Sequence, residues 1–138
     1  MLFLTSTLSL ATRWSIMKRI VARTMMDNHF IEIDDLESLD RFVANLNGSV
    51  GVVFKHSNTC GVSSRAYAEM SKLTFPIGIV VVQHARSVST EIEKRWQVNH
   101  ETPQVLIIKD GKIVWNASHF QVKAAEVEAA VKEVSSGW

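Results

Sequence analysis

Residues 50–63 read VGVVFKHSNTCGVS. The first part, Val50–Phe54, is an apolar run rich in β-branched side chains, which is typical of a strand buried inside a sheet. A polar turn at 56–59 follows it, and a helix is expected to begin near Cys60. The stretch therefore predicts a buried strand, a turn and a helix that starts at the single cysteine of the chain.

Four further strands are predicted outside this stretch. They are rich in Val and Ile or follow turn signals, and they cover residues 30–33, 77–82, 105–108 and 112–115. Asp110-Gly111 separates the last two and predicts a two-residue hairpin, which makes those two strands antiparallel. Strands that are separated by helices are expected to pair in parallel.

Four helices are predicted from apolar residues at helical spacing. The first covers 36–46, and we expect Asp34 to cap it with Glu37 three residues on. The second runs from near Cys60 until Pro76 ends it.

The remaining two helices are recognised by their apolar faces. Val88, Ile92 and Trp96 mark the third helix, for which we expect Ser87 or Ser89 to act as the cap. Val127, Ala130, Val131 and Val134 mark the last one. The element order predicts an α/β fold with a mixed central sheet of about five strands, flanked by about four helices.

Composition narrows the class of protein. The 138 residues suit one domain, and 46% apolar and 21% charged residues are typical of a globular protein. A net charge of +1 gives no reason to expect a nucleic-acid or membrane partner. One cysteine excludes an intramolecular disulfide, and the histidines lack zinc-ligand spacing, so we expect no metal site and a reducing, cytoplasmic location.

The N-terminal segment 1–26 differs from the rest of the chain. It holds four basic residues and no acidic one, and it is rich in Ser and Thr. This composition resembles a transit peptide, and it also fits a stretch upstream of the true translation start, at Met25 or Met26. We therefore expect a disordered basic extension at 1–26 and a folded domain at 27–138.

Cys60 is the candidate reactive residue. It follows the carboxyl end of the buried strand, where ligands gather in parallel sheets, and a helix N-terminus stabilises an anion such as a thiolate. We expect three further groups to stabilise the thiolate: the hydroxyl of Ser63, one helical turn on, and positive charge on Lys55 and His56. We take Lys55 to be exposed, so that solvent and salt screen its charge, and we expect Ser63 to lower the pKa of Cys60 more than Lys55 does. The polar neighbours of Cys60 argue against a merely structural buried cysteine.

Two separate blocks, FKHSNTCGVS at 54–63 and ETPQVLIIKDGKIVWNASHF at 101–120, resemble the monothiol bacilliredoxin family. The resemblance spans about 29–134 and implies a thioredoxin-like fold. It also implies an enzyme that acts on mixed disulfides between proteins and bacillithiol, a low-molecular-weight thiol, in a general stress response. The co-substrate would be that small thiol, the partners S-thiolated client proteins, and the protein a monomer without a tightly bound cofactor. Gly61 departs from the family, which more often has Pro or Ser there.

Two other functions stay open at this point. Residues 60–63, Cys-Gly-Val-Ser, are close to the Cys-Gly-Phe-Ser motif of monothiol glutaredoxins, which hold an iron–sulfur cluster with glutathione. The rest of the chain fits those proteins poorly. A non-catalytic thioredoxin-fold adaptor is the third possibility. Ser63 stands where a resolving cysteine would be, which excludes a cycle through an internal disulfide.

The resemblance also predicts the residues around the thiol. Thioredoxin-like folds place a cis-proline before the strand that faces the active cysteine, so we expect a cis bond at Thr102-Pro103, with the Thr102 backbone free to pair with an incoming chain.

The remaining candidates follow from chain geometry. The hairpin at Asp110-Gly111 returns the chain to the end of the sheet where Cys60 lies, so Ser118 and His119 are expected at the rim of the site. Together with Thr59 and Gly61, which flank the thiol, they complete the predicted substrate-binding set.

Overall fold

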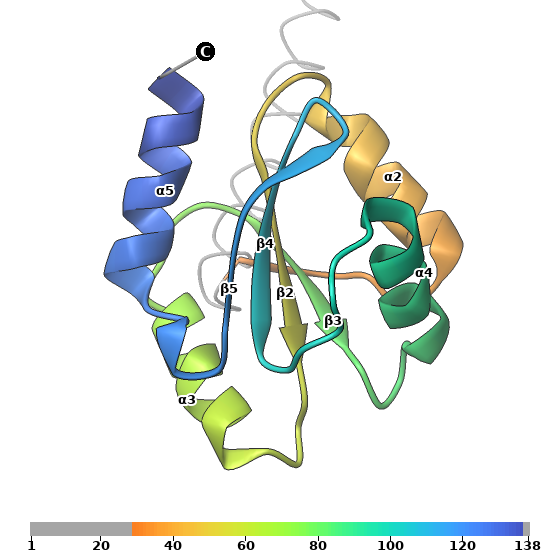
Figure 1. The fold of residues 1–138 in the computed structure, drawn as a ribbon, viewed down its shortest axis with the longest axis vertical. Helices are drawn as coiled ribbons and strands as arrows, with labels where there is room; N and C mark the ends of the chain where they lie inside the picture. Colours follow the sequence, from red (N-terminus) through yellow and green to blue (C-terminus); the bar gives the residue numbers. More distant parts are fainter. Residues whose placement is uncertain (1–28, 137–138) are drawn as a thin grey trace, which may run out of the picture.

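The computed structural model describes residues 29–136. The predicted extension at 1–26, the first two residues of the predicted domain and residues 137–138 lie outside the described residues. A five-stranded sheet forms the centre of the fold, with the strand order β1-β3-β2-β4-β5 (Figure 1).

The strands lie close to their predicted positions. Their bounds are β1 Phe30–Glu32, β2 Gly51–His56, β3 Ile77–Val81, β4 Gln104–Lys109 and β5 Lys112–Ser118. β1, β3 and β2 pair in parallel, whereas β4 is antiparallel to β2 and β5 is antiparallel to β4. The expectation of parallel pairing is therefore wrong for β4, although a helix precedes it. The chain enters β4 at the carboxyl end of β2, where Gln104 pairs with Lys55.

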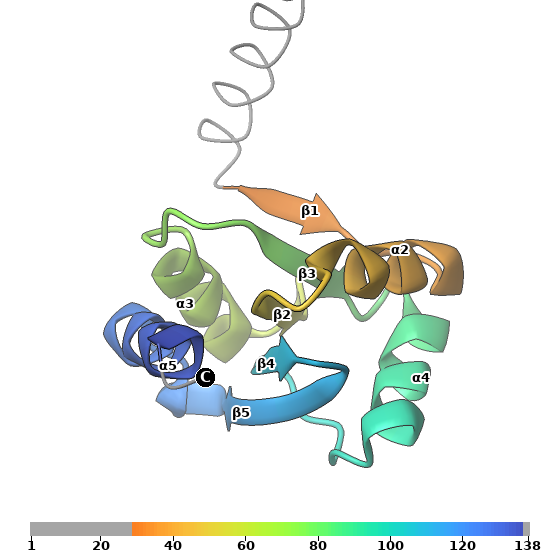
Figure 2. The same ribbon diagram turned by 90° about the horizontal axis from the view of Figure 1, so that it is seen from above.

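Four α-helices of the described part pack in two layers. Figure 2 shows α3 and α5 on one side of the sheet and α2 and α4 on the other. The bounds are α2 Leu36–Leu46, α3 Gly61–Met70, α4 Arg86–Trp96 and α5 Ala124–Ser136, and a short 3-10 helix, η1, covers His119–Gln121. Each layer buries its own apolar cluster against the sheet.

Helix ends differ from the prediction in three places. Asp35, not Asp34, caps α2, and its side chain accepts the N–H of Ser38 at 2.7 Å. Ser38 replaces Glu37 as the capping partner, because its hydroxyl accepts the N–H of Asp35 at 3.1 Å. The sequence holds two adjacent aspartates before this helix, and it is the side chain of Asp35 that reaches the Ser38 N–H.

The other two differences concern α3 and α4. α3 ends at Met70, well before Pro76, and the apolar Leu73 is buried beyond its end. Ala85 is the N-cap of α4 and has no capping side chain. Ser89 lies inside the helix and is buried, and its hydroxyl contacts Nδ1 of His100 at 3.0 Å instead of capping the helix.

The predicted hairpin is confirmed. Asp110 has φ 52° and Gly111 has φ 75°, the left-handed conformation that a tight β-hairpin turn needs at both positions. β5 then runs back along β4 until Ser118 pairs with Gln104. The hairpin thus brings the end of β5 to the carboxyl end of β2, as predicted.

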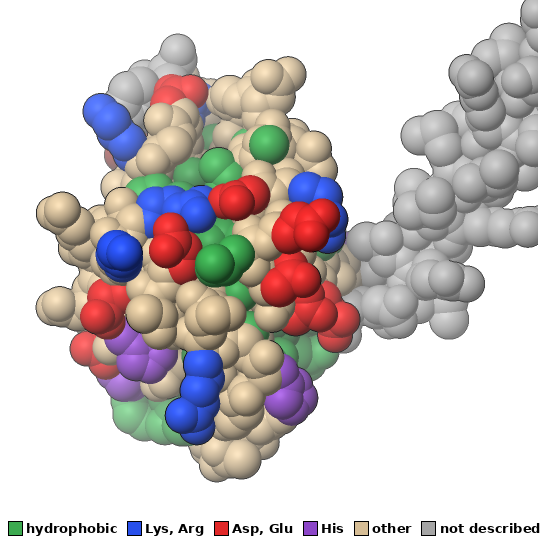
Figure 3. Space-filling view, turned by 90° about the vertical axis from the view of Figure 1, so that its right-hand side faces the viewer, with side chains coloured by type: hydrophobic (Ala, Val, Ile, Leu, Met, Phe, Trp, Pro, Cys, Tyr) green, Lys and Arg blue, Asp and Glu red, His purple; other side chains and the backbone are tan. Residues whose placement is uncertain are grey.

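The surface over α2 and α4 carries charges of both signs. In Figure 3 the acidic and basic side chains on this face are interspersed, and no large area of one sign is visible. None of the helices in the described region is long and apolar enough to cross a membrane.

Candidate functional site

Cys60 occupies the N-cap position of α3. Its backbone is extended, with φ −109° and ψ 126°, and its side chain is partly exposed. The first bond of the helix runs from the N–H of Ser64 to the carbonyl of Cys60 at 3.0 Å. Among residues 29–136, no acceptor bonds the backbone N–H groups of the first three helical positions, 61–63. Unbonded N–H groups at a helix N-terminus favour a negative charge, and Cys60 lies at such a terminus as the sequence predicted; its reactivity stays a prediction.

Ser63 supports the turn before Cys60. Its side chain is fully buried, and its hydroxyl accepts the Ser57 N–H at 2.9 Å and lies 2.7 Å from Nδ1 of His56. Within the described residues it makes no hydrogen bond to the sulfur of Cys60. Its predicted effect on the thiolate therefore stays a prediction, while its structural role is to hold the polar turn in place.

His56 lies in the same layer as Ser63. Its ring is tilted against two aromatic rings, with centroids 5.4 Å from that of Phe54 and 5.1 Å from that of Tyr67. Burial lowers the pKa of His56 below its ordinary value. At neutral pH the ring is therefore uncharged, and it acts through its hydrogen bond to Ser63 instead of as the positive charge that the sequence suggested.

Lys55 lies on the opposite side of β2, because side chains alternate along a strand. It is fully buried, so the expectation that it is exposed is wrong. Its Nζ lies 2.7 Å from Nδ1 of His100 and 3.2 Å from Oε1 of Gln104. These partners lie 45 and 49 residues away in the chain, so the local sequence gave no sign of them.

Gln83 holds the loop before the thiol, and sequence reasoning missed it. Its Nε2 donates to Oγ of Ser57 at 2.7 Å and to Oγ1 of Thr59 at 3.0 Å. Its Oε1 accepts the N–H of Asn58 at 3.3 Å. One side chain from the loop between β3 and α4 therefore contacts all three residues that precede Cys60. Its place just past the carboxyl end of a parallel strand is the signal that could have found it.

The Thr102-Pro103 peptide bond is cis, as predicted. Neither the N–H nor the carbonyl of Thr102 hydrogen-bonds to any residue in the range 29–136. These groups are therefore available to an extended chain, which is the arrangement that the sequence led us to expect.

Ser118 and His119 reach the rim of the site through the hairpin. The N–H of His119 donates to the carbonyl of Pro103 at 2.9 Å, and its Nε2 lies 2.7 Å from Oε2 of Glu101. His119 has φ 55°, a left-handed conformation that is uncommon for a residue with a side chain and is often found at functional sites. The hairpin thus joins the 118–119 segment to Pro103, and a role in binding substrate stays a prediction.

Gly61 begins α3 directly after the thiol. A Cβ atom built on it meets nothing within 4 Å. The backbone beside Cys60 is therefore open on this side, and Thr59, which Gln83 holds, flanks it on the other.

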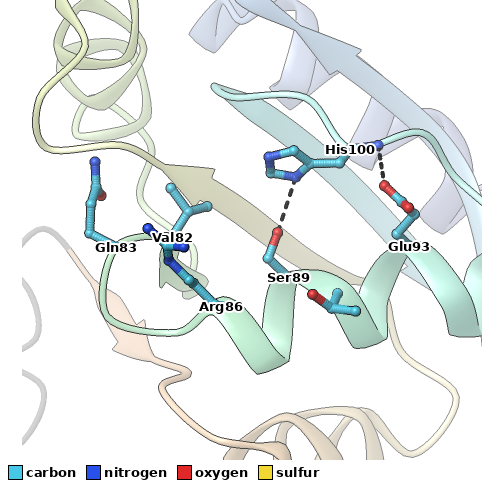
Figure 4. A pocket seen from close by; sticks show the side chains of 7 residues that line it. Val82, Gln83, Arg86, Ser89, Glu93 and His100 are labelled. Carbon is cyan, nitrogen blue, oxygen red and sulfur yellow. Dashed lines mark hydrogen bonds between the residues drawn. The ribbon is translucent and has the colours of Figure 1, made fainter.

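A cavity of about 460 Å³ lies beside the loop that Gln83 holds. It is formed between α4 and the segment before Pro103, and it is lined by Val82, Gln83, Arg86, Ser89, Thr90, Glu93 and His100 (Figure 4). Within the part of the chain that the structure describes, no three His, Cys, Asp or Glu side chains are placed to hold a metal ion.

Solved structures with the same fold agree with this arrangement. A thioredoxin-fold protein assigned as an oxidoreductase matches with a TM-score of 0.70 and 25% identity, over 80% of this chain and 98% of its own. Thioredoxin from Fasciola hepatica has a TM-score of 0.61 and 17% identity, over 74% and 96% of the two chains. A mutant thioredoxin from Halobacterium salinarum has a TM-score of 0.62 and 11% identity, over 78% and 92%.

The fold is therefore thioredoxin-like, as the sequence predicted, and the likeness to the first of these structures indicates a thiol redox role. The model of a protein family described as monothiol bacilliredoxin BrxC matches residues 31–127, which is most of the described chain. The chain therefore belongs to the monothiol bacilliredoxin family.

Proposed function

We propose that this protein is a monothiol thiol–disulfide exchange enzyme that removes a low-molecular-weight thiol from protein mixed disulfides. The observation that carries the proposal is the position of Cys60, the single cysteine, partly exposed at the N-terminus of α3 with unbonded N–H groups behind it. A thiolate is the nucleophile in such exchange, and this position favours it.

The exchange step needs one cysteine and no external electron acceptor. The Cys60 thiolate attacks the small thiol's sulfur in the mixed disulfide, and a new disulfide forms between the two. The bond to the client's sulfur breaks, and the client leaves as a thiolate that takes a proton from water. The client is reduced, and Cys60 is oxidised to a mixed disulfide.

A second thiol must complete the cycle, because the chain holds no resolving cysteine. A second small thiol attacks the sulfur of the bound one and releases Cys60 as a thiolate, together with the disulfide of the small thiol. Membership of the bacilliredoxin family supports bacillithiol as that small thiol. The cycle would run in a reducing compartment, and we propose the cytoplasm as that location.

The client would bind along the segment before β4. Thr102 offers an unbonded N–H and carbonyl for pairing with an extended chain, and Pro103 is joined to the rim through His119. Gly61 leaves the backbone beside the thiol open. These features support a client that binds as a short extended segment, with its disulfide over Cys60.

Cys60→Ser tests the proposal. We expect the variant to lose exchange with a client that carries a small-thiol mixed disulfide, and to keep its fold by circular dichroism. Ser64→Ala, an exposed change on the same helix, is the control and keeps exchange. Turnover by Cys60→Ser above the uncatalysed rate would contradict the proposal.

A further inference from the structure

Lys55 is a buried amine that the exchange step does not use. Its Nζ lies 2.7 Å from Nδ1 of His100 and 3.2 Å from Oε1 of Gln104. Both partners are uncharged at neutral pH, since burial and the charge of Lys55 lower the pKa of His100. No carboxylate within residues 29–136 lies at ion-pair distance from Nζ. The amine is therefore tied to one short segment, residues 100–104, and not to an anion.

The positive charge of Lys55 is held at a cost in stability. Burial lowers its pKa from 10.5 to about 8, and the carboxylates of Glu93 and Glu101 oppose this change from a distance. The amine therefore keeps its proton at neutral pH, in surroundings that favour the neutral form. Burial of a charge costs free energy, and no carboxylate in contact offsets that cost. Lys55 is therefore a candidate for a role other than stabilising the fold.

The two partners of Lys55 lie on either side of the Thr102-Pro103 bond. His100 comes two residues before Thr102, and Gln104 follows Pro103 directly. Lys55 and Gln104 are also opposite each other in the register of β2 and β4. One ammonium group thus connects the entry and the exit of the segment along which the client would bind.

The ammonium group fixes the orientation of both partners. It can only donate, so Nδ1 of His100 and Oε1 of Gln104 both accept from it. With its oxygen on Lys55, the Gln104 amide presents Nε2 to the carbonyl of Asn99, to which it donates at 3.1 Å. Glu93 of α4 accepts the main-chain N–H of His100 at 2.9 Å (Figure 4). Lys55 therefore lies at the centre of the bonds that hold this segment against the sheet and α4.

The rim of the site holds the other side of the same segment. His119 contacts the carboxylate of Glu101 at 2.7 Å, and its N–H donates to the carbonyl of Pro103 at 2.9 Å. Each residue from 99 to 104 except Thr102 therefore has a hydrogen bond to another residue of the described chain. The segment is fixed on both sides of the one residue whose main chain is free.

We propose that Lys55 is a positioning residue, which holds residues 100–104 in the conformation in which Thr102 pairs with a client beside Cys60. The inference rests on the proposed exchange reaction and adds the group that prepares the client-binding segment. Lys55 acts through His100 and Gln104 and touches neither the client nor the thiol. Such preorganisation favours substrates that pair with the segment, because the segment need not be ordered at each binding event.

Two peptides that differ only in their capacity to pair test this. One is an extended hexapeptide whose single cysteine forms a mixed disulfide with 2-mercaptoethanol. The other is the same adduct with N-methyl groups on the cysteine and on both its neighbours, which removes the main-chain donors. We call the ratio of their kcat/KM values the pairing preference. We expect about tenfold for the full-length wild type, which is the order of one or two main-chain hydrogen bonds.

Lys55→Met is expected to reduce the pairing preference to about twofold or less, mainly through a higher KM for the unmethylated peptide. The rate for the methylated peptide and the alkylation of Cys60 by iodoacetamide should stay close to wild type, because His56 and Ser63 support the thiol from the other side of β2. A merely structural role would lower the rates for both peptides together. Lys112→Met, at the exposed start of β5, is the control and keeps the preference.

His100→Ala is a second variant, which removes one of the two partners of Lys55. His100 is exposed as a residue, so this variant should fold, and it decides the proposal alone if Lys55→Met does not fold. We expect it to lower the pairing preference as well. The double variant should lose no more than Lys55→Met does, since the two residues act through one contact. An unchanged preference in the single variants, or losses that add in the double variant, overturn the proposal.

The same data separate this proposal from the exchange reaction. Equal rates for the two peptides in the wild type overturn pairing along Thr102, and with it the role of Lys55, and leave the exchange reaction standing. Consumption of neither peptide above the uncatalysed rate overturns the exchange reaction itself.

Discussion

Lys55 and His56 are neighbours in β2, and their side chains enter opposite layers of the fold. His56 lies under α3, where it contacts the hydroxyl of Ser63 and supports the turn that presents Cys60. Lys55 lies on the α4 side, where it contacts His100 and Gln104. The α3 side is a neutral hydrogen-bonded support, whereas the α4 side buries a charge. The difference teaches that one strand can place two neighbouring side chains in unlike surroundings, a neutral support for the turn before Cys60 and a buried amine on the other side.

Breaking the α3 side should have the largest effect on stability. Ser63→Ala leaves the Ser57 N–H and Nδ1 of His56 without their buried partner. Each such group costs about 1–3 kcal/mol, so the free energy of unfolding should fall by about 4 kcal/mol. Urea denaturation measures it. Ser64→Ala, whose hydroxyl is exposed, is the matched control and should change stability by less than about 0.5 kcal/mol.

The thiol should respond to the same substitution. Since the turn before Cys60 loosens in Ser63→Ala, we expect a lower thiolate absorbance at pH 7 and slower alkylation by iodoacetamide than in Ser64→Ala. Equal alkylation rates in the two variants would show that Ser63 supports the fold and not the thiol.

On the α4 side, we expect burial of Lys55 to make the stability of the protein depend on pH. The pKa of Lys55 is lowered from 10.5 to about 8 in the folded protein. Between these values the unfolded chain binds a proton that the folded protein has released. Stability of the wild type relative to Lys55→Met therefore rises with pH across this window, by up to about 3 kcal/mol. This gain in stability is complete above pH 10.5 and is lost as the pH falls through about 8.

Denaturation at a series of pH values from 7 to 10.5 measures this difference. Lys112→Met, at the exposed start of β5, is the control for loss of a lysine and should differ from the wild type by less than about 0.5 kcal/mol. A constant difference between the wild type and Lys55→Met over that window would show that Lys55 is not buried as a charge.

Gly61 should give the smallest effect. It occupies the first position of α3, where proline is favoured, and an added side chain meets nothing within 4 Å. Gly61→Pro should therefore stabilise the fold by about 0.4–1 kcal/mol, by restricting the unfolded chain. Thermal denaturation checks the change, and a lower melting temperature than that of the wild type would show that the Gly61 N–H or its backbone freedom is needed.

Sequence reasoning succeeded where the signal is local. The apolar run before Cys60, the Asp110-Gly111 turn and the proline of the Thr102-Pro103 bond each predicted a feature that the structure has. The return of Ser118 to the site followed from the length of the hairpin. Short-range chemistry fixes these features, so they could be found without the structure.

Sequence reasoning failed where distant segments meet. Lys55 was expected to be exposed, and the predicted strand ended at Phe54, yet β2 continues to His56 and is buried along its whole length. His100 and Gln83 were missed because their partners lie 45 and up to 26 residues away. Only the strand order brings these side chains together, and that order is a property of the whole sheet.

The intact mass of the protein after one turnover tests the central claim most directly. The full-length protein is mixed with an excess of a client that carries a small-thiol mixed disulfide, with no free thiol present, and is quenched with acid. We expect the protein to gain the mass of the small thiol less two hydrogens, on the peptide that contains Cys60, while an equal amount of client is released reduced. An unmodified Cys60 beside reduced client, or an adduct that carries the client itself as the end product, would contradict the account.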